Sequence, residues 1–373
     1  MILGGALLLR LAYALKLGSR FYQIDEVGYD APAKILAETG ALSGIIAPPI
    51  PVGFFALFYK LFGHDMLWPR LGQAFAGTAV VWLVGRMTRD VTRSERAGAL
   101  AMLVAAVYPF FVYYGGVLMS ETFYVLFVTL ALWQLMAGRA WLGGLALGLS
   151  ALCRVEGAFI APLVLLAARR KEAALFFLIP VLAWMGRNKL AVGAFTLDNH
   201  GGMTLIHGTM YHDLAQEKDT ADVMKAVENE PWYQEAQRRP EHERDALYRK
   251  AAVEWMKANP GATARGWLEK LWLFWRPYPR TDKVYHQTEH SKPDVGLGRG
   301  ALVAISLLFE PWLILLGLYG LWKLRAWPAW AFIAGTCGIH VLVVSMMRYR
   351  LPVMPLLIMG ACFALSRRSG TAR

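Results

Sequence analysis

The sequence carries little charge and almost no cysteine. Only 18% of its 373 residues are Asp, Glu, Lys or Arg, against about a quarter in soluble proteins. The three cysteines, Cys153, Cys337 and Cys362, all lie in or beside apolar runs, so the sequence holds neither a disulfide framework nor a zinc-binding spacing. No internal repeat or low-complexity tract is evident, which excludes solenoid architectures.

Hydrophobic residues make up 56% of the chain and recur in runs long enough for helices that cross or enter a membrane. Only helices and closed barrels satisfy backbone groups in lipid, so we predict an all-α polytopic membrane protein. The apolar runs cover residues 1–17, 51–62, 68–86, 97–114, 121–137, 141–153, 157–168, 173–187, 301–322, 327–345 and 351–366. The first run lacks a basic n-region and a small-residue cleavage site, so we expect a spanning helix there.

The net charge of +12 does not indicate nucleic-acid binding, because no basic face with interleaved stacking aromatics is present. Lys and Arg gather instead in short loops beside the apolar runs, where they set membrane topology. The chain has 14 Trp and 15 Tyr, which suit the aromatic belts at the two membrane surfaces. The basic residues therefore indicate orientation in a bilayer.

The run 51–62 is short and follows Pro48-Pro49, so it is either a span or a helix lying on the membrane surface. If it does not span and the N-terminus is cytoplasmic, all the basic loops face the cytoplasm, as the positive-inside rule requires. These loops contain Arg86, Arg89, Arg93 and Arg96, then Arg139, then residues 169–171, then Lys323 and Arg325, then Arg367, Arg368 and Arg373. We therefore predict a surface helix at 51–62 and about ten spans, with both termini inside.

This topology divides the chain into three parts. Residues 1–188 form an N-terminal transmembrane module that includes an outer loop at 18–67. Residues 189–300 form a mostly helical outer segment, and residues 301–373 the C-terminal transmembrane helices.

Helices are expected within the outer parts. Apolar residues at i, i+4 and i+7 predict a helix over 28–40. The outer segment should contain a helix over 241–258, and Asn259 should then cap a second helix that starts at Pro260. That second helix has an apolar face suited to lying against the membrane.

Adjacent carboxylates follow the first run, at Asp25 and Glu26 in the sequence FYQIDEVGYD. They are either a solvated loop pair or a site where a carboxylate accepts the proton of an attacking hydroxyl. Glu121 stands at another outer helix end, where Ser120 could cap the helix and Glu121 could favour its positive end. Alternatively, Glu121 approaches Asp25, and a divalent metal bound by Asp25 and Glu121 stays possible.

Arg348 and Arg350 lie at the outer end of the penultimate span, a side on which topology disfavours cations. A fixed guanidinium there could hold a phosphate with two hydrogen bonds. Arg154, between two short helices, is expensive to bury and is either functional or paired with Glu156 or Glu121. Lys270 could also reach a headgroup, although snorkelling to the membrane surface is commoner for Lys.

Other outer residues are candidates for contacting a sugar or an acceptor. Tyr29 follows the carboxylate pair, Asn188 ends the span 173–187, and His207 lies in the Gly-rich stretch NHGGMTLIHG. That stretch is either a flexible connection or a loop that approaches a sugar or phosphate. It matches neither phosphate-loop fingerprint.

Several segments, in order, resemble a known family. IDEVGYDAPAKIL, PPIPVGFFALFYKLFG, PRLGQAFAGT, SETFYVLF, ALCRVEG, GRNKLAVGAFTLDNHGGMTLIHG, ANPGATARGWLEKLWLFW and RYRLPVMP are similar to the GT-C membrane glycosyltransferases. The closest groups are glycosyltransferase family 39, which contains the dolichyl-phosphate-mannose protein mannosyltransferases, and the bacterial aminoarabinose transferases. The latter have Lys before the Pro pair, where this chain has Ala47.

The resemblance implies a GT-C-like bundle with surface helices in the first outer loop and a sugar donor linked to polyprenyl phosphate. It implies that Asp25 is the catalytic base, that Glu26 and Glu121 support it, and that Arg348 and Arg350 lie near the lipid phosphate. Arg154 and Lys270 are further phosphate candidates.

The expected enzyme is an inverting hexosyl- or pentosyltransferase that requires no cofactor. Its partners would be the lipid bilayer and a glycan, lipid or protein acceptor, with no nucleic acid. Its place would be the bacterial inner membrane, with the active site on the periplasmic side. The alternative is a transporter or lipid flippase, which would carry charged residues along a midplane pathway and repeated halves.

Overall fold

A computed structural model describes residues 1–373 except 24, 43, 45–47, 215–224, 280–298 and 369–373. The described part is helical and contains no strand, which confirms the all-α class. The N-terminal helices are α1 (Ile2–Leu17), α2 (Asp25–Thr39), α3 (Pro49–Phe62), α4 (Leu67–Thr92), α5 (Glu95–Val107), α6 (Pro109–Tyr114), α7 (Glu121–Met136), α8 (Ala140–Cys153), α9 (Glu156–Ala168) and α10 (Ala173–Val192).

The remaining helices follow residue 200. They are α11 (Gly201–Ile206), η1 (His207–Tyr211), α12 (His212–Leu214), α14 (Pro231–Gln237), α15 (Glu241–Ala258), α16 (Pro260–Trp275), α17 (Arg299–Leu324), α18 (Trp327–Leu342), η3 (Met347–Val353) and α19 (Met354–Arg368). Of these, η1 is a π-helix and η3 a 3-10 helix.

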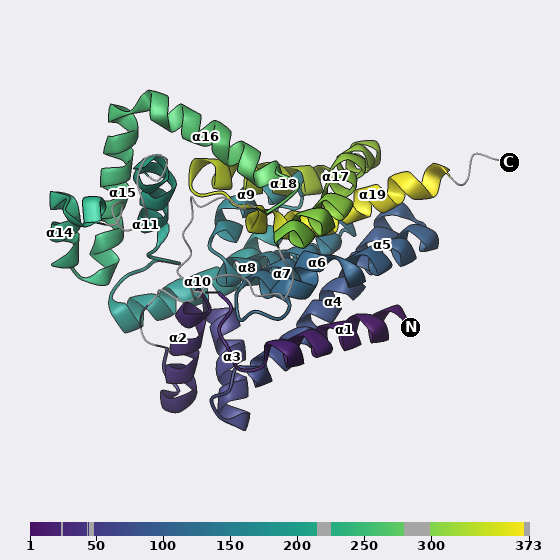
Figure 1. Ribbon diagram of the computed structural model, residues 1–373, viewed down its shortest axis with the longest axis horizontal. Helices are drawn as coiled ribbons and strands as arrows, with labels where there is room; N and C mark the ends of the chain where they lie inside the picture. The colour runs from purple at the N-terminus through teal and green to yellow at the C-terminus, as the bar shows by residue number, and fades with distance from the viewer. Residues whose placement is uncertain (24, 43, 45–47, 215–224, 280–298, 369–373) are drawn as a thin grey trace.

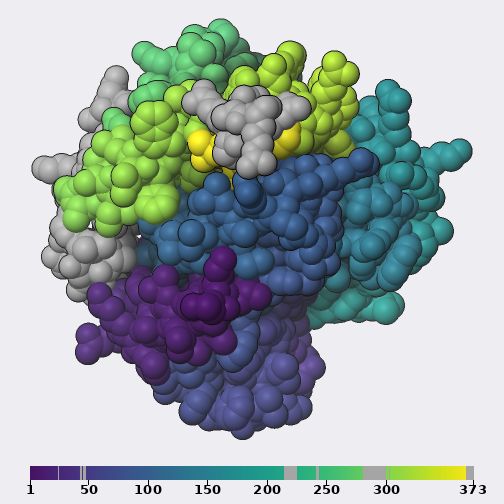
Figure 2. Space-filling view, turned by 90° about the vertical axis from the view of Figure 1, so that its right-hand side faces the viewer, coloured from purple at the N-terminus to yellow at the C-terminus, as the bar shows by residue number. Residues whose placement is uncertain are grey.

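The start of α1 and the end of α19 lie at one end of the bundle, together with the turn between α4 and α5 (Figure 1). Figure 2 views the molecule from that end, where the start of α1 in purple lies beside α4 and α5 in blue. The helices α11, α14 and α15 lie at the opposite end, and α2 and α3 run across the direction of α1 (Figure 1). The division into a basic-loop side and an outer side stays a prediction from the loop charges.

Three helices are long and apolar enough to cross a membrane, judged by length and composition among the described residues: Ala173–Val192, Val303–Leu324 and Met347–Ser366. Shorter apolar helices are Pro49–Phe62, Glu121–Met136, Ala140–Cys153, Glu156–Ala168 and Trp327–Leu342. The expected tight pair around Arg154 is formed by α8 and α9. The number of about ten spans stays a prediction from the loop charges.

Helices α17 and α19 approach closely because glycine lies at their contact. A Cβ added at Gly320 would come within 1.9 Å of the Gly360 carbonyl oxygen, and one at Gly360 within 2.2 Å of that of Gly317. Small residues allow such backbone contact between helices in a membrane. The close packing fixes α19, and with it the η3 helix that precedes it.

Two helix boundaries and one helix cap differ from those expected from the sequence. The run 97–114 is divided into α5 and α6, because Pro109 cannot continue the hydrogen bonding of α5. The helix expected over 28–40 begins earlier, so that Asp25 and Glu26 occupy its first turn. Asn259 precedes α16 as expected, but its side chain donates to the Trp255 carbonyl instead of capping α16, which corrects the predicted cap.

Candidate functional site

Asp25 begins α2, and its Oδ2 accepts a hydrogen bond from Nη1 of Arg348 at 2.6 Å. The two residues are 323 positions apart in the chain, so η3 brings the second half of the protein onto the first outer helix. The Asp25 side chain is 40% exposed and that of Arg348 is 20% exposed. A carboxylate in the first helical turn also lies favourably near the positive end of the helix. Asp25 is therefore fixed at the site and still open to solvent.

Glu26 has a different environment, although it is the next residue. Its Oε1 accepts from Nη2 of Arg70 and from the backbone N–H of Leu118, both at 2.8 Å. Its Oε2 accepts from the N–H groups of Tyr22 at 2.6 Å and Gln23 at 2.9 Å. The side chain is fully buried. With both oxygens accepting hydrogen bonds, Glu26 anchors the start of α2 beside Asp25, and its predicted supporting role in catalysis stays a prediction.

Glu121 begins α7 and is buried, as the predicted approach to the outer cluster requires. Its Oε1 accepts from Nη1 of Arg154 at 3.2 Å, and its buried Oε2 has no hydrogen-bond partner among the described residues. Ser120 does not cap α7; its Oγ accepts from the hydroxyl of Tyr29 at 3.0 Å. Burial raises the pKa of Tyr29 to about 12, which keeps this donor protonated. Tyr29 thus connects α2 with the start of α7.

Arg154 lies between α8 and α9, as expected from the sequence. Its Nε donates to Glu156 at 2.5 Å, while its Nη1 donates to Glu121 and, more weakly at 3.4 Å, to Ser120. Its guanidinium carbon is 5.2 Å from the ring centroid of Tyr349, and that of Arg348 is 5.0 Å from the same ring. Tyr349 therefore joins the Asp25–Arg348 pair to the Glu121–Arg154 pair, which makes one site from four separate segments.

Arg350 does not join this site, which corrects the predicted phosphate contact. Its Nη2 donates to Oε2 of Glu310 at 2.6 Å, and its Nη1 donates to the carbonyls of Phe274 and Arg276. The other Glu310 oxygen accepts from the hydroxyl of Tyr108. Arg350 is 1% exposed, so its guanidinium ties η3 to α16 and α17 inside the protein. Successive residues of a 3-10 helix point in different directions, which places Arg348 and Arg350 in different surroundings.

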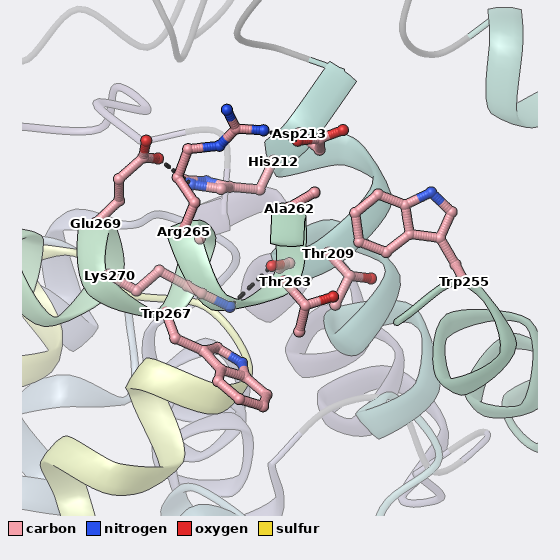
Figure 3. Close-up of a pocket in the computed structure, with 12 residues that line it drawn as sticks. Thr209, His212, Asp213, Trp255, Ala262, Thr263, Arg265, Trp267, Glu269 and Lys270 are labelled. Carbon is pink, nitrogen blue, oxygen red and sulfur yellow. Dashed lines mark hydrogen bonds and ion pairs between the residues drawn. The ribbon is translucent and has the colours of Figure 1, made fainter. Parts of the chain in front are cut away.

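Lys270 is also used internally. Its ammonium donates to three carbonyls, those of Gly208 at 2.8 Å, Val343 at 3.1 Å and Leu342 at 3.2 Å. Burial lowers the pKa of Lys270 to about 8. Figure 3 shows it pointing from α16 toward the segment that carries Thr209. Its three donors are occupied, so the predicted phosphate contact is not supported.

The pocket beside Lys270 is too small for a sugar. It is lined by residues of η1, α12, α15 and α16, including Trp255, Trp267 and the His212–Glu269 pair, whose atoms are 2.9 Å apart (Figure 3). The space inside is about 10 Å³, enough for one water molecule. This pocket is therefore not a candidate sugar site.

The remaining sequence candidates lie away from the cluster. Asn188 is fully buried; its amide donates to the Thr196 carbonyl at 2.9 Å and accepts from Arg187 at 3.1 Å. His207 is exposed and packs edge-on against Tyr211, with ring centroids 4.8 Å apart. Neither makes a contact with the Asp25 group among those seen in the described residues. Asn188 in particular has a structural role instead of the predicted one.

The sequence analysis did not identify Arg70 or Tyr349, and it did not find that Glu310 pairs with Arg350 inside the protein. Arg70 stands in PRLGQAFAGT, where a cation at the outer start of a span, opposite an acidic pair, was a usable signal. Tyr349 stands between two arginines in MRYRLPVMP, which is the pattern of an aromatic ring with nearby cations. Among the described residues, no group of three or more His, Cys, Asp or Glu is placed to hold a metal ion.

The family comparison matches residues 47–185 of this chain with the dolichyl-phosphate-mannose-protein mannosyltransferase family. The resemblance to GT-C membrane glycosyltransferases is confirmed. The mannosyltransferase match includes Glu121 and Arg154, while Asp25 and Arg348 lie outside the matched segment. No curated protein matches the chain in sequence.

Solved structures similar to this chain include ArnT from Cupriavidus metallidurans bound to undecaprenyl phosphate. That chain is 14% identical with a TM-score of 0.48, and the alignment covers 99% of this chain and 77% of that chain. The apo state of the same protein is 14% identical with a TM-score of 0.45, covering 96% and 76% respectively.

Proposed function

We propose that this protein is an inverting membrane glycosyltransferase that moves a sugar from a polyprenyl-phosphate donor to a hydroxyl group. The observation that carries the proposal is the Asp25–Arg348 pair, a partly exposed carboxylate 2.6 Å from a guanidinium at the end of a helical bundle. The match with a mannosyltransferase family over residues 47–185 supports the reaction class. The resemblance of the sequence motifs to bacterial members supports a place in the inner membrane with the site on the periplasmic side.

The reaction needs a base for the acceptor hydroxyl and an anion-binding group for the leaving phosphate, acting on opposite faces of the anomeric carbon. Oδ1 of Asp25 has no partner among the described residues, so it is available to accept the proton of the acceptor hydroxyl. The acceptor oxygen attacks the anomeric carbon, and the bond from that carbon to the phosphate oxygen breaks on the opposite face. The phosphate leaves with the electron pair and needs no proton, because it is a stable anion.

Arginine stabilises the charge that grows on the leaving phosphate. Arg348 can present its planar guanidinium to two phosphate oxygens, and such charge-assisted pairs are the strong ones. Its buried Nε has no partner among the described residues. Groups already fixed where charge develops lower the barrier, because they need no reorganisation during the reaction. The Glu121–Arg154 pair, connected to Arg348 through the Tyr349 ring, would form the other part of the site.

The acceptor would be an envelope glycan, a lipid or a protein, and the sugar a hexose or pentose. Neither choice rests on a residue contact, so both are proposed from the family resemblance. Mass spectrometry of envelope glycans from a deletion strain would identify the sugar that is lost.

The test is sugar transfer by the purified protein in liposomes, with a radiolabelled polyprenyl-phosphate sugar as donor. Asp25→Asn should lower kcat about 10²- to 10⁴-fold, the usual contribution of a general base. The matched control is Glu38→Gln, which removes a charge from the exposed end of the same helix. Transfer by Asp25→Asn at the wild-type rate would disprove the base, and lipid movement across the bilayer without transfer would favour the flippase alternative.

A further inference from the structure

Tyr349 is the residue on which the two cationic groups of the site meet. The guanidinium carbons of Arg154 and Arg348 lie 5.2 Å and 5.0 Å from its ring centroid, within the roughly 6 Å range of cation–π attraction. Nη2 of Arg348 also donates to the Tyr349 hydroxyl at 3.2 Å. The ring therefore contacts both cations, which come from opposite halves of the chain.

The ring itself is held firmly. It stacks on the imidazole of His340, with centroids 4.2 Å apart and planes 7° from parallel, and His340 in turn stacks on Phe274 at 6.3 Å. The next residue, Arg350, ties the backbone of η3 to Glu310 and to the carbonyl of Phe274. Tyr349 is only 9% exposed. Its orientation is thus set from the α16 and α18 side, independently of any ligand.

The guanidinium of Arg348 keeps a nitrogen for a further acceptor, because its buried Nε has no partner among the described residues. Arg154 is paired with Glu121 and Glu156, whereas Arg348 is paired with Asp25 alone among the described carboxylates. The Tyr349 ring lies against both guanidiniums, so it limits the positions that each can take relative to the other. A phosphate oxygen could accept a hydrogen bond from the Arg348 Nε while the ring holds both guanidiniums in place.

We propose that Tyr349 is a positioning residue of the transfer site, whose ring fixes the spacing of Arg154 and Arg348 for the phosphate of the donor. This rests on the proposed function and extends it to a residue that touches no reacting atom. The ring, more than the hydroxyl, carries the role. Removing the ring leaves each arginine with its carboxylate partner but without the common support.

The experiment compares Tyr349→Phe with Tyr349→Leu in liposomes. Tyr349→Phe keeps the ring and should leave the donor KM and the Kd for polyprenyl phosphate within about threefold of wild type. Tyr349→Leu should raise both by about tenfold, since each lost cation–π contact weakens binding by up to that order. The acceptor KM should stay unchanged. Tyr319→Leu, at a 55% exposed tyrosine of α17, is the control for a lost surface ring.

The outcomes separate the inference from the function on which it rests. If the wild-type protein neither binds polyprenyl phosphate nor transfers sugar, the proposed function is wrong. If the wild-type protein does both and Tyr349→Leu keeps the wild-type donor KM and Kd, only the role of Tyr349 is wrong. If Tyr349→Phe raises the donor KM and Kd as much as Tyr349→Leu does, the hydroxyl carries the role and the proposal for the ring is wrong.

If Tyr349→Leu does not fold, His340→Leu is compared with His340→Phe; both variants lose the 3.8 Å contact of His340 Nε2 with Glu156, and only His340→Leu loses the aromatic stacking on Tyr349. His340→Leu should then have a donor KM about threefold above that of His340→Phe with an unchanged acceptor KM, and equal donor KM values contradict the proposal.

Discussion

Two ion pairs meet on the short helix η3 with the same N–O distance and opposite surroundings. Asp25–Arg348 and Glu310–Arg350 are both 2.6 Å long. The side chains of the first pair are 40% and 20% exposed, and those of the second are 0% and 1% exposed. Distance alone therefore does not tell a functional pair from a structural one. Solvent access does, because only the first pair can exchange its partner for a ligand.

The strongest way to test this contrast is to break the buried pair. Glu310→Gln should lower the free energy of unfolding by about 3–5 kcal/mol, since it leaves the buried Arg350 without its counter-charge. The measurement is denaturant or thermal unfolding of the purified protein in detergent. Arg348→Gln is the matched variant and should cost at most about 1 kcal/mol, as exposed pairs do. Equal losses of stability in the two variants would contradict the distinction.

Breaking the exposed pair should affect the donor more than the fold. Arg348→Gln should raise the donor KM about 10- to 100-fold, because a hydrogen bond to a charged group contributes about 1.5–3 kcal/mol. Arg348→Lys keeps the charge and loses the planar fork, so it should lie between Gln and wild type. Steady-state kinetics in liposomes measure both. A donor KM unchanged in Arg348→Gln would remove Arg348 from the phosphate site.

A smaller effect is expected on the affinity for polyprenyl phosphate when the Asp25 charge is removed. If Arg348 must leave Asp25 to bind phosphate, Asp25→Asn should bind polyprenyl phosphate about threefold to fivefold more tightly while losing activity, because an exposed pair contributes at most about 1 kcal/mol. The gain should vanish in Asp25→Asn made on the Arg348→Gln background. Equilibrium binding of labelled polyprenyl phosphate gives both values. A gain that persists in that background would show simple charge repulsion by Asp25 instead.

Sequence patterns predicted the helices better than the contacts of their side chains. The helices α3, α8 and α9 follow from the lengths of the apolar runs, and the surface position of α3 stays a prediction from the loop charges. The sequence also singled out Asp25, Glu121, Arg154 and Arg348, because each stands at an outer helix end where topology does not require a charge. The structure brings these four segments together.

The wrong or missing contacts share a physical cause. Arg350 and Lys270 were also candidates, but carbonyls distant in sequence occupy their donors, and the amide of Asn188 is used by Thr196 and Arg187. Periodicity gives the face of a helix on which a residue lies, and it does not give the partner that this face meets. The same limit hid Arg70, whose contact with Glu26 joins residues 44 positions apart.

Arg348 and Arg350 pair with different carboxylates although only one residue separates them, so both pairs depend on the number of residues in η3. A 3-10 helix has about three residues per turn, so each residue adds a rotation of about 120°. An inserted or deleted residue between Arg348 and Arg350 would turn one guanidinium away from its partner whatever side chain it carried. Homologous enzymes could therefore vary the residues at η3 one by one to suit different donors, while the number of residues between the two arginines stays fixed.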